Sequence, residues 1–164
     1  MAKLIDAQSY DALHQAEEQE KIKILIDEYP AFNPLPGQFL LDIGCGTGIS
    51  MSQWNCEKMG VDPNHEMLAI AQENGLTAIQ AHPESLPFSD GTFDFILSVT
   101  ALHLADNPEK CLKEFLRIAK SGAIIALSIL ASSKRAGEWA ALLSSIADQS
   151  FSALNDVFYV FQKK

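Results

Sequence analysis

The stretch FLLDIGCGTG at residues 39–48 decides the fold class of this chain. Its first half, 39–43, is too apolar to have a solvated face, which is typical of a buried strand in a parallel sheet. Its second half has glycine at every second position, at Gly44, Gly46 and Gly48. Glycine is needed where a positive φ or the close approach of another group excludes a Cβ. The stretch therefore predicts a buried strand that ends in a loop able to lie close to a ligand.

Strands and helices alternate along the rest of the chain. Apolar runs predict further strands at 58–62, 76–81, 93–99 and 123–130. Helices are expected at 10–29, 49–54, 65–75, 108–120 and 134–149, and a hairpin with Asn155-Asp156 at its turn joins 151–154 to 157–164. Alternation with short turns is typical of an open parallel sheet covered by helices on both faces. The predicted fold is α/β, a single-domain, Rossmann-like, doubly wound sheet that is mostly parallel and has an antiparallel C-terminal hairpin strand.

Composition argues against several classes of function. The formal net charge of -9, from 12 basic and 21 acidic residues, gives a field that repels polyphosphates, so no nucleic-acid partner is expected. No apolar stretch reaches the ~20 residues that span a bilayer, and no secretion signal is seen, so a cytoplasmic protein without membrane association is expected. Cys45, Cys56 and Cys111 match neither a zinc site nor a disulfide framework, which predicts reduced thiols and no metal site.

The glycine loop does not fit the common phosphate-binding patterns. A dinucleotide fingerprint would have its third glycine at Ile49, and a nucleoside triphosphate loop would need a lysine between Lys23 and Lys58, where there is none. Asp62 ends the next predicted strand, where a carboxylate can accept both hydroxyls of a ribose, although it could instead cap the following helix. Asp42 lies in an apolar strand and needs a partner, such as a ligand ammonium or backbone amides. These residues favour a ligand with an adenosine and no phosphate.

Four ordered motifs resemble those of the class I S-adenosylmethionine-dependent methyltransferases, and more narrowly their small-molecule branch, which includes the quinone-biosynthesis methyltransferases. The motifs are LDIGCGTG at 41–48, GVDPNHEMLAIA at 60–71, ESLPFSDGTFDFILS at 84–98 and EFLRIAKSGAIIALSI at 114–129. The resemblance covers about residues 37–130. It implies a seven-stranded sheet with the last strand antiparallel, S-adenosylmethionine as the cofactor, and transfer of a methyl group to a small-molecule acceptor.

The resemblance also implies a set of cofactor-binding residues. The glycine loop would cradle the methionine part of the cofactor, with Asp42 near its ammonium and the main chain of Ser98 at the same end. Asp62 would hold the ribose, and Pro63 and Met67 would flank the adenine. The complete set is Asp42, Gly44, Cys45, Gly46, Gly48, Asp62, Pro63, Met67, His82, Pro83 and Ser98.

One segment departs from the family pattern. Where the family commonly has Gly-Asp-Ala before Leu-Pro-Phe, this chain has Ala81-His82-Pro83. Proline has no N–H to donate, and a neutral histidine is a poorer acceptor than a carboxylate. We therefore expect His82 and Pro83 to hold the adenine differently from the usual pattern, or more weakly.

We expect a single methyltransferase domain, 1–164, made of three parts. Residues 1–36 form an N-terminal helical cap, 37–130 the cofactor-binding core, and 131–164 a C-terminal helix and hairpin. The substrate would be covered by the N-terminal helices, the 100–107 loop and the segment after the fifth strand.

His103, just beyond the fourth strand, is the candidate general base, which is needed only when the nucleophile must lose a proton. A histidine packed beside its leucine neighbours is the alternative. Tyr10 is the candidate substrate residue because it could close over the site from the N-terminal segment, although an exposed helix tyrosine is equally consistent with the pattern.

Two other functions stay open. A non-catalytic module of the same fold that binds S-adenosylmethionine or a nucleoside would account for His82-Pro83 and for the lack of a sizeable substrate cap. Methylation of nucleic-acid bases would want an Asn/Asp-Pro-Pro-aromatic motif after the fourth strand, where this chain has SVTALH at 98–103.

Overall fold

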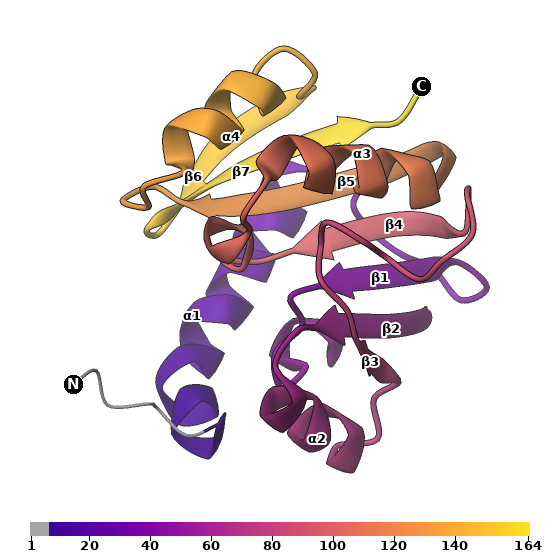
Figure 1. Ribbon diagram of the computed structural model, residues 1–164, viewed down its shortest axis with the longest axis vertical. Helices are drawn as coiled ribbons and strands as arrows, with labels where there is room; N and C mark the ends of the chain where they lie inside the picture. Colours follow the sequence, from indigo (N-terminus) through magenta and orange to yellow (C-terminus); the bar gives the residue numbers. More distant parts are fainter. Residues whose placement is uncertain (1–6) are drawn as a thin grey trace.

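The computed structural model describes residues 7–164 (Figure 1). Its helices are α1 (Ala7–Glu28), α2 (His65–Glu73), α3 (Pro108–Ile118) and α4 (Ala136–Leu143), with short 3-10 turns η1 (Ile49–Met51) and η2 (Leu102–Leu104). Its strands are β1 (Phe39–Ile43), β2 (Glu57–Asp62), β3 (Ala78–Gln80), β4 (Phe93–Ser98), β5 (Ala119–Leu130), β6 (Gln149–Ala153) and β7 (Asp156–Gln162). Within this part of the chain, none of the helices combines the length and apolar character needed to cross a bilayer.

The strands of the described chain form one seven-stranded sheet in the order β3-β2-β1-β4-β5-β7-β6. Strands β1 to β5 run parallel to one another, and β7 runs antiparallel to both β5 and β6. The chain builds outward from β1 to the edge at β3 and then returns to β4 on the other side of β1. This reversal places a ligand-binding crevice beyond the carboxyl ends of β1 and β4. The predicted α/β fold, with its antiparallel C-terminal hairpin strand, is confirmed.

Helices cover both faces of the sheet (Figure 1). Alternate residues of one strand point to opposite faces, so Leu41 joins the core beneath α3 and α4, together with Trp139, whereas Leu40 joins the core beneath α1. In that second core, Ile22 and Leu25 of α1 are fully buried. The α1 helix is therefore an integral layer of the fold.

Two elements near the C-terminus differ from the predicted bounds. The last helix ends at Leu143 rather than near 149, because Ser144 and Ser145 favour helix ends and the Asp148 N–H donates to the Val160 carbonyl, which directs the chain into β6. The fifth strand begins at Ala119 instead of 123, since it already pairs with the start of β4 there. The other predicted helices and strands are present, with shorter cores at η1 and β3.

The C-terminal hairpin turns one residue earlier than predicted. Its turn residues are Leu154, with φ of 56°, and Asn155, and Asp156 is the first residue of β7. There Asp156 pairs with Ala153 and Leu130 and is buried. A residue expected in an exposed turn thus brings a carboxylate into the interior.

Candidate active site

The loop that follows β1 is shaped by its glycines. Gly44, Gly46 and Gly48 have φ of 75°, 54° and 92°, a region that residues with a Cβ rarely occupy. A Cβ on Gly44 would overlap the Cβ of Ala101 in the segment after β4, and one on Gly48 would overlap the Leu76 side chain. The sequence indicated that some group lies close to the glycines. At these two positions that group is another part of the protein.

The Asp62 carboxylate is fixed in place at the end of β2. The Gly46 N–H donates to its Oδ2 at 2.9 Å, and the Asn64 N–H donates to its Oδ1 at 2.8 Å. The N-cap of α2 is Asn64, whose side chain accepts from the N–H groups of Glu66 and Met67. Asp62 is therefore not the helix cap, and an ionised carboxylate with two such bonds still has lone pairs for ligand hydroxyls.

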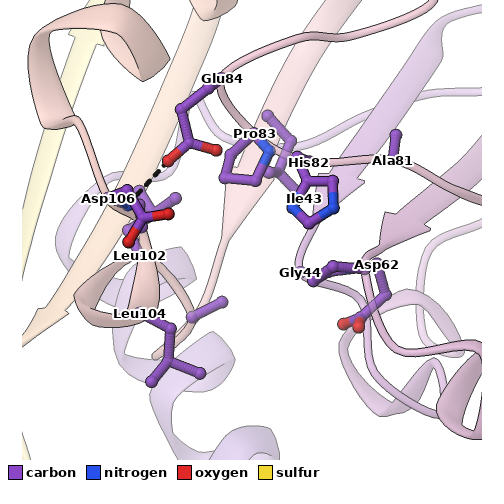
Figure 2. Close-up of a pocket in the computed structure, with 13 residues that line it drawn as sticks. Ile43, Gly44, Asp62, Ala81, His82, Pro83, Glu84, Leu102, Leu104 and Asp106 are labelled. Atoms are coloured by element: carbon purple, nitrogen blue, oxygen red, sulfur yellow. Dashed lines mark hydrogen bonds between the residues drawn. The ribbon is translucent and has the colours of Figure 1, made fainter.

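A pocket opens at this end of the sheet (Figure 2). Its lining residues are Ile43, Gly44, Asp62, Pro63, Ala81, His82, Pro83, Glu84, Ala101, Leu102, Leu104, Ala105 and Asp106. Five of them were predicted as cofactor residues: Gly44, Asp62, Pro63, His82 and Pro83. Figure 2 shows Asp62 on one side of the pocket and Glu84 with Asp106 on the other. This lining contains carboxylates and neither lysine nor arginine, so it disfavours a phosphate ligand.

The other predicted cofactor residues lie outside this lining. The N–H groups of Gly44 and Cys45 both donate to the Val61 carbonyl, at 2.8 and 3.0 Å, so that with the Gly46–Asp62 bond the loop amides are engaged within the protein. Burial raises the pKa of the Cys45 thiol, and the charges of Asp42 and Asp62 add to this effect. Cys45 therefore stays protonated and packs as a small apolar group under the loop.

Gly48, Met67 and Ser98 also lie beside the pocket lining rather than in it. Ser98 is buried, and its hydroxyl donates to the Ile43 carbonyl at 2.7 Å, which ties β4 to β1. Met67 is half-buried in the first turn of α2, and Gly48 precedes η1.

Asp42 is buried beneath the glycine loop. The Ser50 hydroxyl donates to its Oδ2, but its Oδ1 has no hydrogen-bond partner among the described residues. Burial raises the pKa of Asp42 to about 7; the Ser50 bond opposes this shift and the Asp62 charge adds to it. A buried carboxylate oxygen without a donor suits a nearby cationic group, and this fits the ammonium of the cofactor implied by the sequence.

Glu84 is a pocket residue that the sequence reasoning missed. Its Oε1 accepts from the N–H groups of Asp106 and Asn107 at 2.7 and 3.3 Å (Figure 2 shows the first bond). Burial would raise the pKa of Glu84, but these and other hydrogen bonds outweigh it and lower the pKa. Glu84 joins the loop after β3 to the start of α3, a contact between distant segments for which a single sequence has no signal.

The segment after β4 separates this pocket from a second one. Ala101 and Leu102 line the first pocket, Thr100 and His103 line the second, and Leu104 lines both. The second pocket lies between this segment and α1, with lining residues His14, Glu17, Glu18, Lys21, Thr100, His103, Leu104, Leu130 and Asn155. Its walls come from four segments: α1, the segment after β4, the end of β5 and the hairpin turn. Of these, α1 and the segment after β4 are among the segments expected to cover the substrate.

A buried ionic network holds the wall of the second pocket together. Lys21 Nζ lies 3.1 Å from Asp156 Oδ1 and 2.8 Å from Thr100 Oγ1, and both charged side chains are at most 1% exposed. The hydroxyls of Thr100 and Ser128 each donate to Asp156 Oδ2 at 2.6 Å. Thr100 has φ of 51°, an outlier for a β-branched residue that persists only where the surroundings enforce it. The sequence reasoning missed Lys21, although it lies four residues before Leu25, on the inward side of α1.

His103, the predicted general base, lies in the wall of the second pocket. Its Nδ1 is buried and has no hydrogen-bond partner among the described residues. Burial lowers the pKa of His103; Asp156 opposes this shift and Lys21 adds to it. The imidazole is therefore neutral near pH 7 and able to accept a proton. Tyr10, the predicted substrate residue, belongs to α1, but its side chain lies outside the described residues.

Residues 41–127, more than half of the chain, match a family model described as a methyltransferase domain. The chain belongs to the S-adenosylmethionine-dependent methyltransferase family. Its cofactor is S-adenosylmethionine, as the motifs implied, and the pocket with Asp62 at the end of β2 and the orphaned Asp42 oxygen fits that molecule.

Similar proteins agree with this assignment. An uncharacterized protein of Methanocaldococcus jannaschii is 43% identical over 90 residues, which cover 55% of this methyltransferase and 43% of the relative. Ajmaline N-methyltransferase of Rauvolfia serpentina is 31% identical over 121 residues, with 62% and 41% covered. This methyltransferase thus spans about two-fifths of the length of these curated relatives.

A solved structure shows the same fold along nearly the whole chain. It is a methyltransferase of Thermotoga maritima, described as a possible histamine N-methyltransferase, which superposes with a TM-score of 0.70 at 22% identity and covers 96% of this chain and 94% of that one.

Proposed function

We propose that this methyltransferase transfers the methyl group of S-adenosylmethionine to a small-molecule acceptor. The observation that carries the proposal is the pair of pockets on either side of residues 100–104, joined at Leu104. The first has the fixed carboxylate of Asp62, and the second is a space lined by four segments of one chain, with charged and polar side chains among its lining.

The first pocket is the proposed cofactor site. When bound, S-adenosylmethionine supplies a methyl group on a positively charged sulfur. Asp62 would hold the ribose hydroxyls, and Asp42 would lie toward the ammonium. His82 and Pro83 would line the adenine end, where His82 is exposed and the loop is closed by the Ser85 N–H, which donates to the His82 carbonyl at 3.0 Å. The remaining predicted cofactor residues would support the loop from below.

The second pocket is the proposed acceptor site. Alignment of the two reactants and exclusion of water account for much of the catalysis in a displacement of this kind. The fixed 100–104 segment provides the alignment, because it touches both pockets. His103 would take a proton from a nucleophile that must lose one, and Tyr10 would cover the acceptor from α1.

Three observations support a small molecule as the acceptor. The second pocket is built within a single chain, the chain carries a net charge of -9, which repels nucleic acid, and a curated relative is named ajmaline N-methyltransferase. The placement in the quinone-biosynthesis branch rests on the motifs at 41–98 and is part of this proposal.

Calorimetry with S-adenosylmethionine tests the cofactor site. Wild type should bind, and Asp62→Ala should bind at least about tenfold more weakly, since hydrogen bonds to a charged group contribute about 1.5–3 kcal/mol. Glu73→Ala, on the exposed end of α2, is the matched control and should bind like wild type. Absence of binding by wild type at millimolar cofactor would refute the proposal.

A non-catalytic binding module is the second candidate, favoured by the His82-Pro83 departure and by the engaged loop amides. Incubation with methyl-labelled cofactor and a broad panel of acceptors separates the two. Transfer of the label to a small molecule excludes a purely binding role, whereas tight cofactor binding without transfer to any member of the panel favours it.

A further inference from the structure

The charges in the wall of the second pocket bear on the chemistry of the acceptor. Lys21 is the cation among the described lining residues, and its ammonium is fully engaged. Its three partners are Glu17 Oε1 at 2.7 Å, Thr100 Oγ1 at 2.8 Å and Asp156 Oδ1 at 3.1 Å. An ammonium has three donors and no more. Lys21 is therefore not available to bind an acidic acceptor.

The remaining charge of this wall is negative. Glu17 and Glu18 line the pocket, and Asp156 lies directly behind Thr100, so this wall contains three carboxylates and the single ammonium of Lys21, which pairs with Glu17 and Asp156.

The uncharged polar groups of the pocket also include a hydrogen-bond acceptor. His103 lines the pocket, and a neutral imidazole has one ring nitrogen that lacks a proton and accepts a hydrogen bond. Carboxylates accept and never donate when ionised. A ligand that donates hydrogen bonds and carries positive charge therefore satisfies this wall, and a ligand that only accepts does not.

We propose that the second pocket takes a small molecule with a basic amine, and that the amine nitrogen is the atom methylated. This inference rests on the proposed function, which it narrows to one class of acceptor. An alcohol would offer one donor and no charge, and a carboxylate or phosphate ester would be repelled by Glu17 and Glu18.

The transfer step balances with the groups present. An ammonium has no lone pair, so it first gives a proton to neutral His103. The freed nitrogen lone pair forms the new bond to the methyl carbon as the carbon–sulfur bond breaks, and that electron pair stays on sulfur, which becomes a neutral thioether. The methylated nitrogen leaves as an ammonium, and the proton on His103 passes to water. The carboxylates stabilise the positive nitrogen before and after the step.

Equilibrium binding to the wild-type protein saturated with S-adenosylhomocysteine tests the class of acceptor without relying on turnover. The probes are matched compounds on phenethyl and hexyl frames that differ only in an amine, a hydroxyl or a carboxylate. The amines should bind at least about tenfold more tightly than the alcohols, and the carboxylates more weakly still. Equal or tighter binding of the alcohols or carboxylates would overturn the proposal.

Variants of one side chain sharpen the test. Glu18→Gln should weaken amine binding by about fivefold, and Glu18→Lys should invert the preference toward the carboxylates. Glu20→Gln, two positions along α1 on its exposed side, is the control and should change amine binding less than twofold. Equal effects of the Glu18 and Glu20 substitutions would show that the negative wall does not select the ligand.

The failures of the two proposals are distinguishable. If the protein does not bind S-adenosylmethionine, the proposed function fails, while amine binding to the ligand-free protein still decides the selectivity of the pocket. If both cofactor and amine bind but no labelled methyl appears on nitrogen, the nitrogen is not the methylated atom and this inference fails.

Discussion

The two pockets of this methyltransferase, the proposed cofactor side and the proposed acceptor side, are built in different ways. On the cofactor side, the bond from the Gly46 N–H to Asp62 joins residues 16 apart, from the loop after β1 to the end of the next strand, β2. On the acceptor side, Lys21 bonds Thr100 and Asp156 across 79 and 135 residues. The glycine loop and the fixed Asp62 carboxylate are therefore a local product of one strand–loop–strand unit, whereas the second pocket forms only where the N-terminal helix, the middle of the sheet and the C-terminal hairpin meet.

Breaking the acceptor side should have the largest effect on stability. Lys21→Met leaves the buried Asp156 carboxylate without its cation, which should lower the free energy of unfolding by about 3–5 kcal/mol. Denaturant unfolding measures this loss. Lys23→Met, which removes a lysine with 69% side-chain exposure from the same helix, is the control and should change stability by less than about 1 kcal/mol. Comparable losses in the two variants would show that the network is not a structural element.

A substitution at Gly44, on the cofactor side, should lower the free energy of unfolding somewhat less. Gly44→Ala combines an unfavourable positive φ with overlap against Ala101, for an expected loss of about 3 kcal/mol in unfolding free energy. Gly37→Ala is the matched control, because Gly37 has φ of 89° and nothing within 4 Å of an added Cβ. It should lose only about 1 to 2 kcal/mol. If Ala101→Gly fails to restore part of the Gly44→Ala loss, the overlap is not its cause.

The pH dependence of stability sharpens the comparison on the cofactor side. Because the pKa of Asp42 is raised to about 7, the folded protein holds a proton that the unfolded chain releases near pH 4. The stabilisation of the folded state by this bound proton is fully present below pH 4 and is lost as the pH rises through about 7. Asp42→Asn should remove this slope and raise the unfolding free energy at pH 8 by on the order of 2 kcal/mol.

The same substitution should weaken binding of S-adenosylmethionine at pH 8, because it removes the charge that we propose lies toward the ammonium. Unfolding curves at pH 5 and pH 8, with calorimetry at pH 8, measure both effects. Asp27→Asn, on the exposed side of α1, is the control and should leave both unchanged. A variant that is less stable than wild type at pH 8 would contradict the inferred burial cost.

The smallest expected effect concerns Glu84, a residue of the cofactor pocket whose hydrogen bonds join segments that are far apart in the sequence. Glu84→Gln keeps an acceptor for the Asp106 N–H and loses the charge, so the cost should be about 1 kcal/mol in stability and a few-fold in cofactor affinity. Thermal unfolding and calorimetry measure these changes, with Glu109→Gln at an exposed position as the control. An unchanged affinity would show that the bond at Asp106 does not shape the pocket.

The features that could be predicted from the sequence divide in the same way, into local features and long-range ones. The strands, the glycine loop and Asp62 at the end of a strand carry local signals, in hydrophobic periodicity and in turn residues, and the structure has them. The end of α4 and the start of β5 were wrong because pairing with distant strands sets them.

Lys21, Glu84 and Asp156 were missed for a related reason. Each looks like an ordinary surface or turn residue, and only its tertiary partners make it part of the site. His103 was found from its position after the fourth strand, whereas its place in a second pocket with Lys21 and Glu18 required the structure.

The bond between Lys21 and Asp156 also constrains the order of folding. These residues are 135 positions apart, so during synthesis the lysine waits for its partner until Asp156 has left the ribosome. The glycine loop and β2 can pair long before that moment. A nascent chain that has not yet reached Asp156 would thus have its glycine loop beside an unfinished wall of the second pocket.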